Sequence, residues 1–284
     1  MIIVDGNQIA LEITQRIARD IFDNSLEDRP GLAIILAGNR DDSALYVDIK
    51  QQRAKEVGID THLYKIEDSE TTEDIVGLIK HLNEDSEIDG ILVQLPLPKK
   101  YNTDIIISSI DPDKDVDFFH PDNVKKLDNY QEEKLNIISP VHGAVLLILE
   151  KNYFELAGRK VVLLVNSEVF AGGLKKILEA KGAEVEIVFP TDSGFKDRIK
   201  TADLLVTAVG KKNLITGEMV KPNVAVIDVG ITKDEDGVWG DVDFEEVKEM
   251  SSFITPVPGG VGPITVAKVL ENVRKLHKEH RTRR

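Results

Sequence analysis

The sequence predicts an α/β protein of two lobes, the second of which is a Rossmann-like, doubly wound parallel sheet. Short runs of β-branched and aliphatic residues alternate with longer segments of helical periodicity along the 284 residues. The strand-like runs are apolar on both faces, which is typical of parallel strands covered by helices on each side. At about 150 residues per domain, the length predicts roughly two domains. We expect a small-molecule site in a cleft between the lobes.

The first lobe is predicted from alternating helices and strands. Its expected elements, in order, are a helix carrying Ile9, Ile13, Ile17 and Ile21, a strand over 31–38, a helix over 43–57, a strand over 62–66, a helix over 73–83 and a strand over 89–98. Gly58 is the expected end of the second helix, and two prolines end the last strand. The acidic segment 111–117 is expected to be a loop.

The second lobe is predicted from a further series of apolar strands. These are expected over 160–165, 185–189, 203–210 and 224–230. The polar stretch 122–133 separates the two series, so we place one domain at 1–138 and the other at 139–262. A last helix, with Pro263 as its first residue, is expected to return to the first domain as 263–284.

Charge and composition exclude several classes of function. Lys and Arg total 36 and Asp and Glu total 50, which gives a net charge of −14. Phosphate backbones and anionic lipid repel such a chain, so we expect neither nucleic acid nor a membrane as partner. Cysteine is absent, no histidine spacing is typical of a metal site, and His277 and His280 are expected on a solvated face. The N-terminal residues show no signal-peptide pattern, so a cytoplasmic protein is expected.

Two polar side chains in the first lobe are candidates for chemistry. Lys50 lies four residues after Tyr46 in a predicted helix, so both project from one face. An ordinary surface pair has this spacing, but a lysine whose pKa is lowered by burial can donate and accept protons. Gln94 interrupts an apolar strand and needs hydrogen-bond partners. Backbone groups could satisfy it, or Gln94 could hold Lys50 or a ligand in place.

The acidic loop has three possible explanations. Its carboxylates are Asp111, Asp113, Asp115 and Asp117. They could form a solvated loop, or a calcium loop, although the glycine and distal glutamate of such loops are absent. Alternatively, one carboxylate faces the cleft and accepts the paired N–H donors of an amino-pyrimidine ring.

Residues 255–265, TPVPGGVGPIT, precede the last predicted helix with three prolines and three glycines. They could form only a rigid turn. The density of these residues favours a functional interpretation, because bare glycine backbone and a helix N-terminus can approach a ligand closely.

Several of these segments together resemble one family. They are Tyr46-x-x-x-Lys50, DGILVQLPLP (89–98), PDKDVD (112–117), DVG (228–230), GDVDF (240–244) and TPVPGGVGPIT (255–265). The family is that of the bifunctional methylenetetrahydrofolate dehydrogenases and methenyltetrahydrofolate cyclohydrolases. The similarity extends over nearly the whole chain.

The resemblance implies a homodimeric enzyme of one-carbon metabolism. It would oxidise 5,10-methylenetetrahydrofolate with NADP or NAD and hydrolyse the methenyl product to 10-formyltetrahydrofolate. The implied catalytic set is Lys50 for proton transfer, Gln94 to orient it, Asp117 to bind the pterin and Tyr46 to stack on the folate. Pro258, Gly259 and Gly260 would line the substrate site. A cationic methenyl carbon beside Lys50 would lower the pKa of that lysine.

The same resemblance assigns domain 1–138, completed by 263–284, to folate and domain 139–262 to the nicotinamide dinucleotide. The implied dinucleotide-binding residues are Asn166, Ser167, Glu168, Thr191, Val209, Gly210, Gly230 and Ile231. The similarity implies no metal.

The second lobe departs from the family pattern GRSxxVGxP over residues 165–173. Val165 and Ala171 replace glycines, Gly173 replaces the proline, and Asn166 replaces the arginine that would bind the 2′-phosphate of NADP. Glu168 adds negative charge there. We therefore predict reduced discrimination in favour of NADP over NAD, unless lysines in the following helix compensate.

Two further departures are Phe118, which could narrow the folate pocket, and His142, both at expected glycine positions. Two alternatives to a bifunctional enzyme follow from the departures. One is a cyclohydrolase with weakened or lost dehydrogenase activity. The other is a non-catalytic folate-binding regulatory subunit, against which the intact catalytic set argues.

Overall fold

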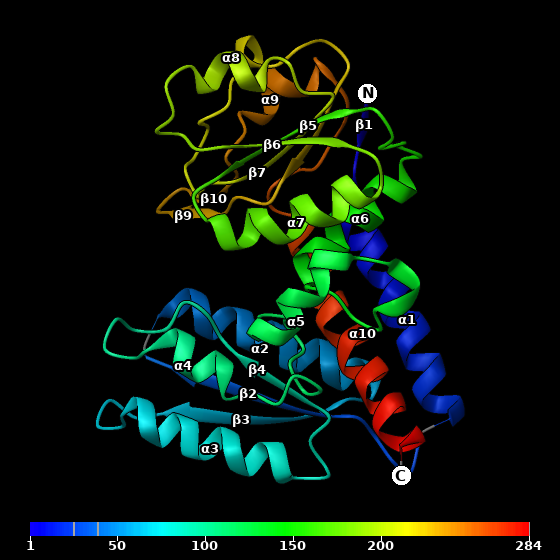
Figure 1. The fold of residues 1–284 in the computed structure, drawn as a ribbon, viewed down its shortest axis with the longest axis vertical. Helices are drawn as coiled ribbons and strands as arrows, with labels where there is room; N and C mark the ends of the chain where they lie inside the picture. The colour runs from blue at the N-terminus through cyan, green and yellow to red at the C-terminus, as the bar shows by residue number, and fades with distance from the viewer. Residues whose placement is uncertain (25, 39, 284) are drawn as a thin grey trace. The chain divides into compact units, whose positions relative to one another are not determined.

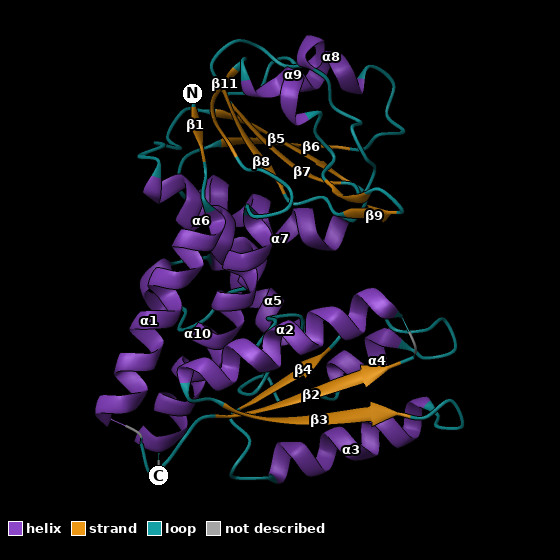
Figure 2. Cartoon of the chain, turned by 180° about the vertical axis from the view of Figure 1, so that it is seen from behind, coloured by secondary structure: helices purple, strands orange, loops and turns teal. Residues whose placement is uncertain are grey.

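The computed structural model describes residues 1–24, 26–38 and 40–283 (Figures 1 and 2). The chain forms two compact units. The six-stranded unit comprises Met1–Ala10, Leu127–Glu132 and Val141–Thr265, and the three-stranded unit comprises Leu11–Lys126, Glu133–Pro140 and Val266–Arg284. Both are α/β units, as predicted.

The three-stranded unit is built on a parallel sheet of order β3-β2-β4. Its strands are β2 (Gly31–Ala37), β3 (Asp60–Ile66) and β4 (Gly90–Val93). Every residue of β2 and of β4 is buried, which confirms the two-sided burial expected from their continuous apolar runs.

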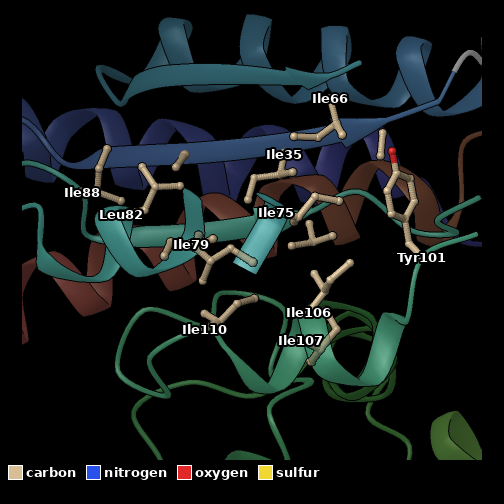
Figure 3. Packing of buried hydrophobic residues seen from close by; sticks show 14 residues of the cluster. Ile35, Ile66, Ile75, Ile79, Leu82, Ile88, Tyr101, Ile106, Ile107 and Ile110 are labelled. Carbon is tan, nitrogen blue, oxygen red and sulfur yellow. The ribbon is translucent and has the colours of Figure 1, made fainter. Parts of the chain in front are cut away.

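One face of this sheet packs on α3 (Thr72–Glu84) and α4 (Thr103–Ser108). Figure 3 shows the aliphatic layer between them, to which Ile35 of β2 and Ile75 and Ile79 of α3 contribute. A capping box starts α3: the Thr71 hydroxyl accepts from the Asp74 N–H, and the Asp74 carboxylate accepts from the Thr71 N–H.

The helix α2 (Asp41–Val57) lies on the opposite side of the sheet from α3 (Figure 1). It ends as predicted at Gly58, whose φ of 86° lies in the left-handed region that glycine adopts without cost. The long helix α10 (Val261–Thr282) also packs on this unit, because a Cβ on Gly90 would lie 3.4 Å from Val273.

The six-stranded unit contains a parallel sheet of order β1-β11-β8-β7-β5-β6. Its strands are β1 (Ile2–Ile3), β5 (Lys160–Val165), β6 (Glu184–Val188), β7 (Leu204–Ala208), β8 (Val224–Asp228) and β11 (Ser251–Ile254). From β5 the chain continues to β6 on one side and then to β7 on the other. This reversal is the switch point of a doubly wound sheet, which confirms the predicted Rossmann-like topology.

Helices and loops complete this unit. The helix α7 (Glu168–Ala180) follows β5, while Ile199 of α8 (Phe195–Ile199) and Val247 of α9 (Phe244–Lys248) join the core on one sheet face. The other elements of the chain are α1 (Gly6–Asn24), α5 (Pro121–Lys125), η1 (Lys126–Asn129), η2 (Glu132–Lys134), α6 (Pro140–Lys151), η3 (Gly217–Met219), β9 (Thr232–Asp234) and β10 (Gly237–Trp239).

Several boundaries differ from the prediction. The strand expected over 89–98 ends at Val93, so Gln94 follows the strand. Short helices occupy the polar stretch 122–133, because Pro121 and the His120 cap start α5. The last helix begins at Val261, so Pro263 is its third residue. Residues 1–10 belong to the six-stranded unit because β1 pairs with β11.

The expectation of a solvated face for His277 and His280 is wrong. His277 is 2% exposed and its Nδ1 lies 2.9 Å from Nη1 of Arg274. His280 Nδ1 lies 3.2 Å from Oδ1 of the fully buried Asp89. His277 Nε2 also lies 3.6 Å from Oδ2 of Asp28, so both histidines of α10 lie beside carboxylates far away in the sequence. In the part of the chain that the structure describes, no helix is long and apolar enough to cross a membrane.

Candidate active site

The structure brings Lys50 and Gln94 into direct contact. Lys50 Nζ, on α2, donates a hydrogen bond of 2.9 Å to Gln94 Oε1. The Gln94 Nε2 donates to the Leu95 carbonyl at 2.7 Å, and its backbone N–H donates to Ile35. Both explanations offered for this amide therefore hold together: backbone satisfies its nitrogen and Lys50 its oxygen. The side-chain orientation of Gln94 is fixed at both ends.

Burial changes the protonation behaviour of Lys50. The side chain of Lys50 is half-buried. Burial lowers the pKa of Lys50 from its ordinary 10.5, and the negative charge of Asp117 partly opposes this shift. The direction is the one that a proton-transfer lysine needs. Its cause in the substrate-free chain is desolvation, which precedes any effect of a cationic substrate.

Asp117 shows the complementary change. Burial raises the pKa of its carboxyl to about 6, the Lys50 charge opposes that rise, and the neighbouring Asp115 adds to it. An acidic group and a basic group are thus both shifted toward neutrality at one place. Tyr46, one helical turn before Lys50, is half-buried on the same helix.

The other acidic residues of the loop have structural partners. Asp115 is 1% exposed, and its Oδ2 accepts from the His120 N–H at 2.7 Å and from Asn123 Nδ2 at 3.0 Å. Asp111 is exposed, and Asp113 pairs with Arg283. Among residues 1–24, 26–38 and 40–283, no three acidic or histidine side chains are arranged to hold a metal ion. Asp115 therefore folds the loop, and sequence reasoning did not single it out for this.

Phe118 follows Asp117 in a conformation that favours glycine. Its φ is 61°, in the left-handed region, which costs an ordinary residue about 1–2 kcal/mol. The side chain is 3% exposed, so apolar burial offsets this cost. The backbone geometry explains why glycine suits the position, and the predicted effect on a folate pocket stays a prediction.

In the six-stranded unit, Asn166 spans the switch point. Its backbone follows β5, and its Nδ2 donates a 2.7 Å hydrogen bond to the Val209 carbonyl, which follows β7. These two strands are the ones between which the chain reverses direction. The predicted residues Thr191, Gly210 and Ile231 follow β6, β7 and β8, and all three are exposed at the same edge of the sheet.

The first turn of α7 carries an acidic side chain. Ser167 is the N-cap residue and makes no side-chain cap hydrogen bond, and Glu168 is exposed in the first turn. Lys175 bonds Glu179 and the Val185 carbonyl, while Lys176 bonds Asp128. The lysines proposed to compensate for the missing arginine are therefore engaged elsewhere.

Two departures from the family pattern, Gly173 and His142, pack together with Phe170. Gly173 closely approaches His142, because a Cβ there would lie 2.7 Å from its Cε1. The His142 Nε2–H donates to the Phe170 carbonyl at 3.1 Å, and the two rings are 5.3 Å apart. Burial lowers the pKa of His142 to about 4, so the ring is neutral. The imidazole occupies space that a larger residue at 173 would need.

The segment that contains Pro258, Gly259 and Gly260 belongs to the six-stranded unit. The Gly6 N–H donates to the Gly259 carbonyl at 2.9 Å, and Gly259 has a φ of 99°. A Cβ on Gly260 would lie 2.4 Å from the Pro256 carbonyl oxygen. Chain packing alone thus requires both glycines, and their place in a folate site stays a prediction.

Comparison with known proteins decides the family. Residues 4–117 match the profile of the tetrahydrofolate dehydrogenase/cyclohydrolase catalytic domain, and residues 133–281 match that of its NAD(P)-binding domain. The chain belongs to the tetrahydrofolate dehydrogenase/cyclohydrolase family. The bifunctional protein FolD of Staphylococcus aureus is 38% identical over 283 residues, which cover 98% of this chain and 97% of that protein.

Solved structures of the family agree with this fold. The FolD enzyme of Campylobacter jejuni superposes with a TM-score of 0.92 at 37% identity, covering 97% of this chain and 98% of that one. The Trypanosoma brucei enzyme, solved with NADP and an inhibitor, gives 0.93 at 31% identity, covering 98% and 97%. The chain is thus a methylenetetrahydrofolate dehydrogenase/cyclohydrolase of one-carbon folate metabolism, with an NAD(P)-binding domain.

Proposed function

We propose that Lys50 carries the protons of the cyclohydrolase reaction, in which 5,10-methenyltetrahydrofolate becomes 10-formyltetrahydrofolate. The observation that supports this is the lowered pKa of Lys50 combined with its hydrogen bond to Gln94. A neutral amine accepts a proton from the water that attacks the methenyl carbon and returns one when the ring opens. The positive charge of the methenyl group lowers the pKa of Lys50 further.

The remaining folate roles are those that the family resemblance implies. The Asp117 carboxyl accepts the N–H donors of the pterin ring, and Tyr46 stacks on that ring. Gln94 holds Nζ of Lys50 in a single position. Pro258, Gly259 and Gly260 line the substrate. In this assignment Phe118, directly after Asp117, narrows the pterin end of the site.

Replacing Lys50 by Met tests the proposal, with Lys55→Met as the control because Lys55 is exposed on the same helix. We expect the rate of hydrolysis, measured as the decrease in methenyl absorbance, to be lower by about a hundredfold or more in Lys50→Met. The control should keep the wild-type rate. An unchanged rate in Lys50→Met would remove Lys50 from the mechanism.

We further propose that the oxidation of methylenetetrahydrofolate uses either NADP or NAD, with reduced preference for NADP. The residues that would hold the dinucleotide, which would supply the hydride acceptor, are Asn166, Ser167, Glu168, Thr191, Val209, Gly210, Gly230 and Ile231. The N-terminus of α7 lies at the switch point, and the N–H groups of a helix N-terminus suit a pyrophosphate.

The surroundings of the adenosine ribose fit a 2′-phosphate poorly. Asn166 is bonded to Val209. Arg198 follows β6, but Glu186 occupies its Nε and Asp192 its Nη1, at 2.6 and 2.8 Å. Glu168 adds an exposed negative charge. Steady-state oxidation with each cofactor tests this, and a strong preference for NADP would count against it.

A cyclohydrolase with weakened or lost dehydrogenase activity is the second candidate, and the altered turn at residues 165–173 favours it. Calorimetric titration with NAD and with NADP separates the two candidates. Binding of either cofactor supports the bifunctional enzyme, whereas no detectable binding of either supports the second candidate.

We also propose which domain binds which ligand, and the oligomeric state and location of the protein. Residues 1–138, completed by 263–284, bind folate, and residues 139–262 bind the dinucleotide. The family resemblance supports a homodimer, which sedimentation of the purified protein tests, and a cytoplasmic location, which fractionation of the cells tests. The net charge of −14 argues against nucleic acid as a partner.

A further inference from the structure

Two buried aspartates of the six-stranded unit have no role in the proposals above. Asp241 is 0% exposed and Asp228 is 3% exposed. Asp228 is the last residue of β8, and Asp241 lies in the GDVDF segment that follows the β9–β10 hairpin. Buried carboxylates are costly unless hydrogen bonds compensate them, so their donors indicate what they organise.

Asp241 takes three donors from a single short segment. Its Oδ2 accepts from the Thr207 hydroxyl and from the Val209 N–H, both at 2.7 Å. Its Oδ1 accepts from the Lys211 N–H at 2.8 Å. The chain from the end of β7 through Gly210 therefore wraps around this carboxylate. Charge-assisted bonds of this kind are stronger than those between neutral groups.

Asp228 braces the neighbouring loop in the same way. Its Oδ1 accepts from the Gly230 N–H and its Oδ2 from the Val242 N–H, both at 2.9 Å. The two loops also interlock. A Cβ on Gly230 would lie 2.2 Å from the Asp241 carboxyl carbon, and one on Gly240 would lie 2.0 Å from Oδ2 of Asp228. Only glycine permits these contacts.

Both backbone polar groups of Val209 are therefore hydrogen-bonded. Its carbonyl accepts from Asn166 at the switch point, and its N–H donates to Asp241. We propose that Asp241 is a positioning residue for the dehydrogenase reaction, which fixes segment 209–211 in the conformation that receives the nicotinamide dinucleotide. Asp228 supports it by fixing Gly230. This inference rests on the proposed function, in which Val209, Gly210, Gly230 and Ile231 hold the cofactor.

The substitution Asp241→Asn tests the inference with little change of shape. The amide keeps one acceptor oxygen and turns an NH₂ group toward at least one of the three donors, so segment 209–211 loses part of its support. The KM for the dinucleotide should rise by about tenfold, with a smaller change in kcat. Hydrolysis of added methenyltetrahydrofolate, which needs no dinucleotide, should stay at the wild-type rate.

Asp243→Asn is the matched control. It removes the same charge from the same segment, and asparagine can replace Asp243 as the cap of α9, where the side chain accepts from the Glu246 N–H. Its KM for the dinucleotide should equal that of the wild type. If Asp241→Asn gives the same KM as this control, while the wild-type enzyme binds and uses the dinucleotide, the inference is wrong. If the wild type neither binds nor uses it, the proposed function fails instead.

Asp241→Asn could also impair folding, in which case both activities would fall together. Thr207→Val then supplies the test, because it removes only the hydroxyl donor and leaves both backbone bonds to Asp241. We expect a rise in the dinucleotide KM of about threefold, with hydrolysis unchanged. An equal loss of both activities in this variant would reduce Asp241 to a purely structural residue and overturn the inference.

Discussion

The Lys50 region of the three-stranded unit and the switch point of the six-stranded unit differ in the state of their polar side chains. Near Lys50, burial shifts the pKa of an amine down and that of the Asp117 carboxyl up, so both protonation states lie within reach. At the switch point, Asn166, Arg198 and Asp241 have their polar atoms committed to neighbouring groups. The first arrangement suits proton transfer, and the second suits a rigid surface that holds a ligand.

The comparison predicts that Asp117→Asn strongly weakens the binding of folate and leaves the binding of the dinucleotide unchanged. The amide presents an NH₂ group where the carboxyl would accept the pterin donors, so the KM for folate should rise by about a hundredfold. Both activities should be affected, while affinity for the dinucleotide measured by calorimetry stays unchanged. Asp113→Asn, in the exposed part of the same loop, is the control. Equal losses in folate and dinucleotide affinity would show that Asp117 is only structural.

A second prediction concerns stability and pH. Burial, with the neighbouring Asp241, raises the pKa of Asp228 to about 7 in the folded protein, against an ordinary 3.8. Between these values only the folded state keeps the proton, so its contribution is present at pH 4 and lost as the pH rises through 7. Urea unfolding should therefore show this unit about 2 kcal/mol less stable at pH 7 than at pH 5.

In Asp228→Asn this pH dependence should disappear, although the overall stability falls because one backbone N–H then faces an NH₂ group. Asp192→Asn, which changes a half-buried aspartate elsewhere in the same unit, should retain the wild-type slope. A slope that persists in Asp228→Asn would mean that another group titrates.

The third prediction restores a charge at the switch point. Asn166→Arg breaks the bond to Val209 and offers a free guanidinium to a 2′-phosphate. The ratio of kcat/KM with NADP to that with NAD should rise about tenfold. Glu168→Gln should raise the same ratio by a smaller factor. Ratios that do not change would place the 2′-phosphate elsewhere.

The smallest expected effect comes from Gln94→Glu. A carboxylate beside the ammonium raises the pKa of Lys50, so the pH at which hydrolysis reaches its plateau should move upward by about one unit. The plateau rate itself should change little, because Nζ keeps a partner of the same shape. A downward shift would contradict the assignment of Lys50 as the proton acceptor.

Much of the fold could be predicted because it depends on local pattern. Strands β2, β5 and β8 carry continuous apolar runs, and Gly58 marks the end of α2. Strands β1 and β11 could not be predicted, because they are short and depend on pairing. They pair with each other across about 250 residues of sequence, and β11 also pairs with β8. His277 and His280 were wrongly expected to be solvated because their partners, such as Asp89, are distant in the sequence.

The site was predictable to a similar extent. The pairing of Lys50 with Gln94 follows from a buried amide that needs a partner, and the structure contains it. The different roles of Asp115 and Asp117 could not be predicted without the fold. Asp115 is recognised as structural only because His120 and Asn123 donate hydrogen bonds to it. Asp241 lay within a segment that was recognised, but nothing in its spacing indicated that it takes one donor from β7 and two from the residues that follow β7.

The central claim is that the Lys50 amine gives up its proton readily within the folded chain. An NMR titration of the lysine side-chain nitrogens, with Lys50 assigned by its absence from the Lys50→Met spectrum, measures this directly. The account predicts that Lys50 deprotonates at a clearly lower pH than the ordinary 10.5 of a lysine side chain. Titration of Lys50 near that ordinary value would contradict it.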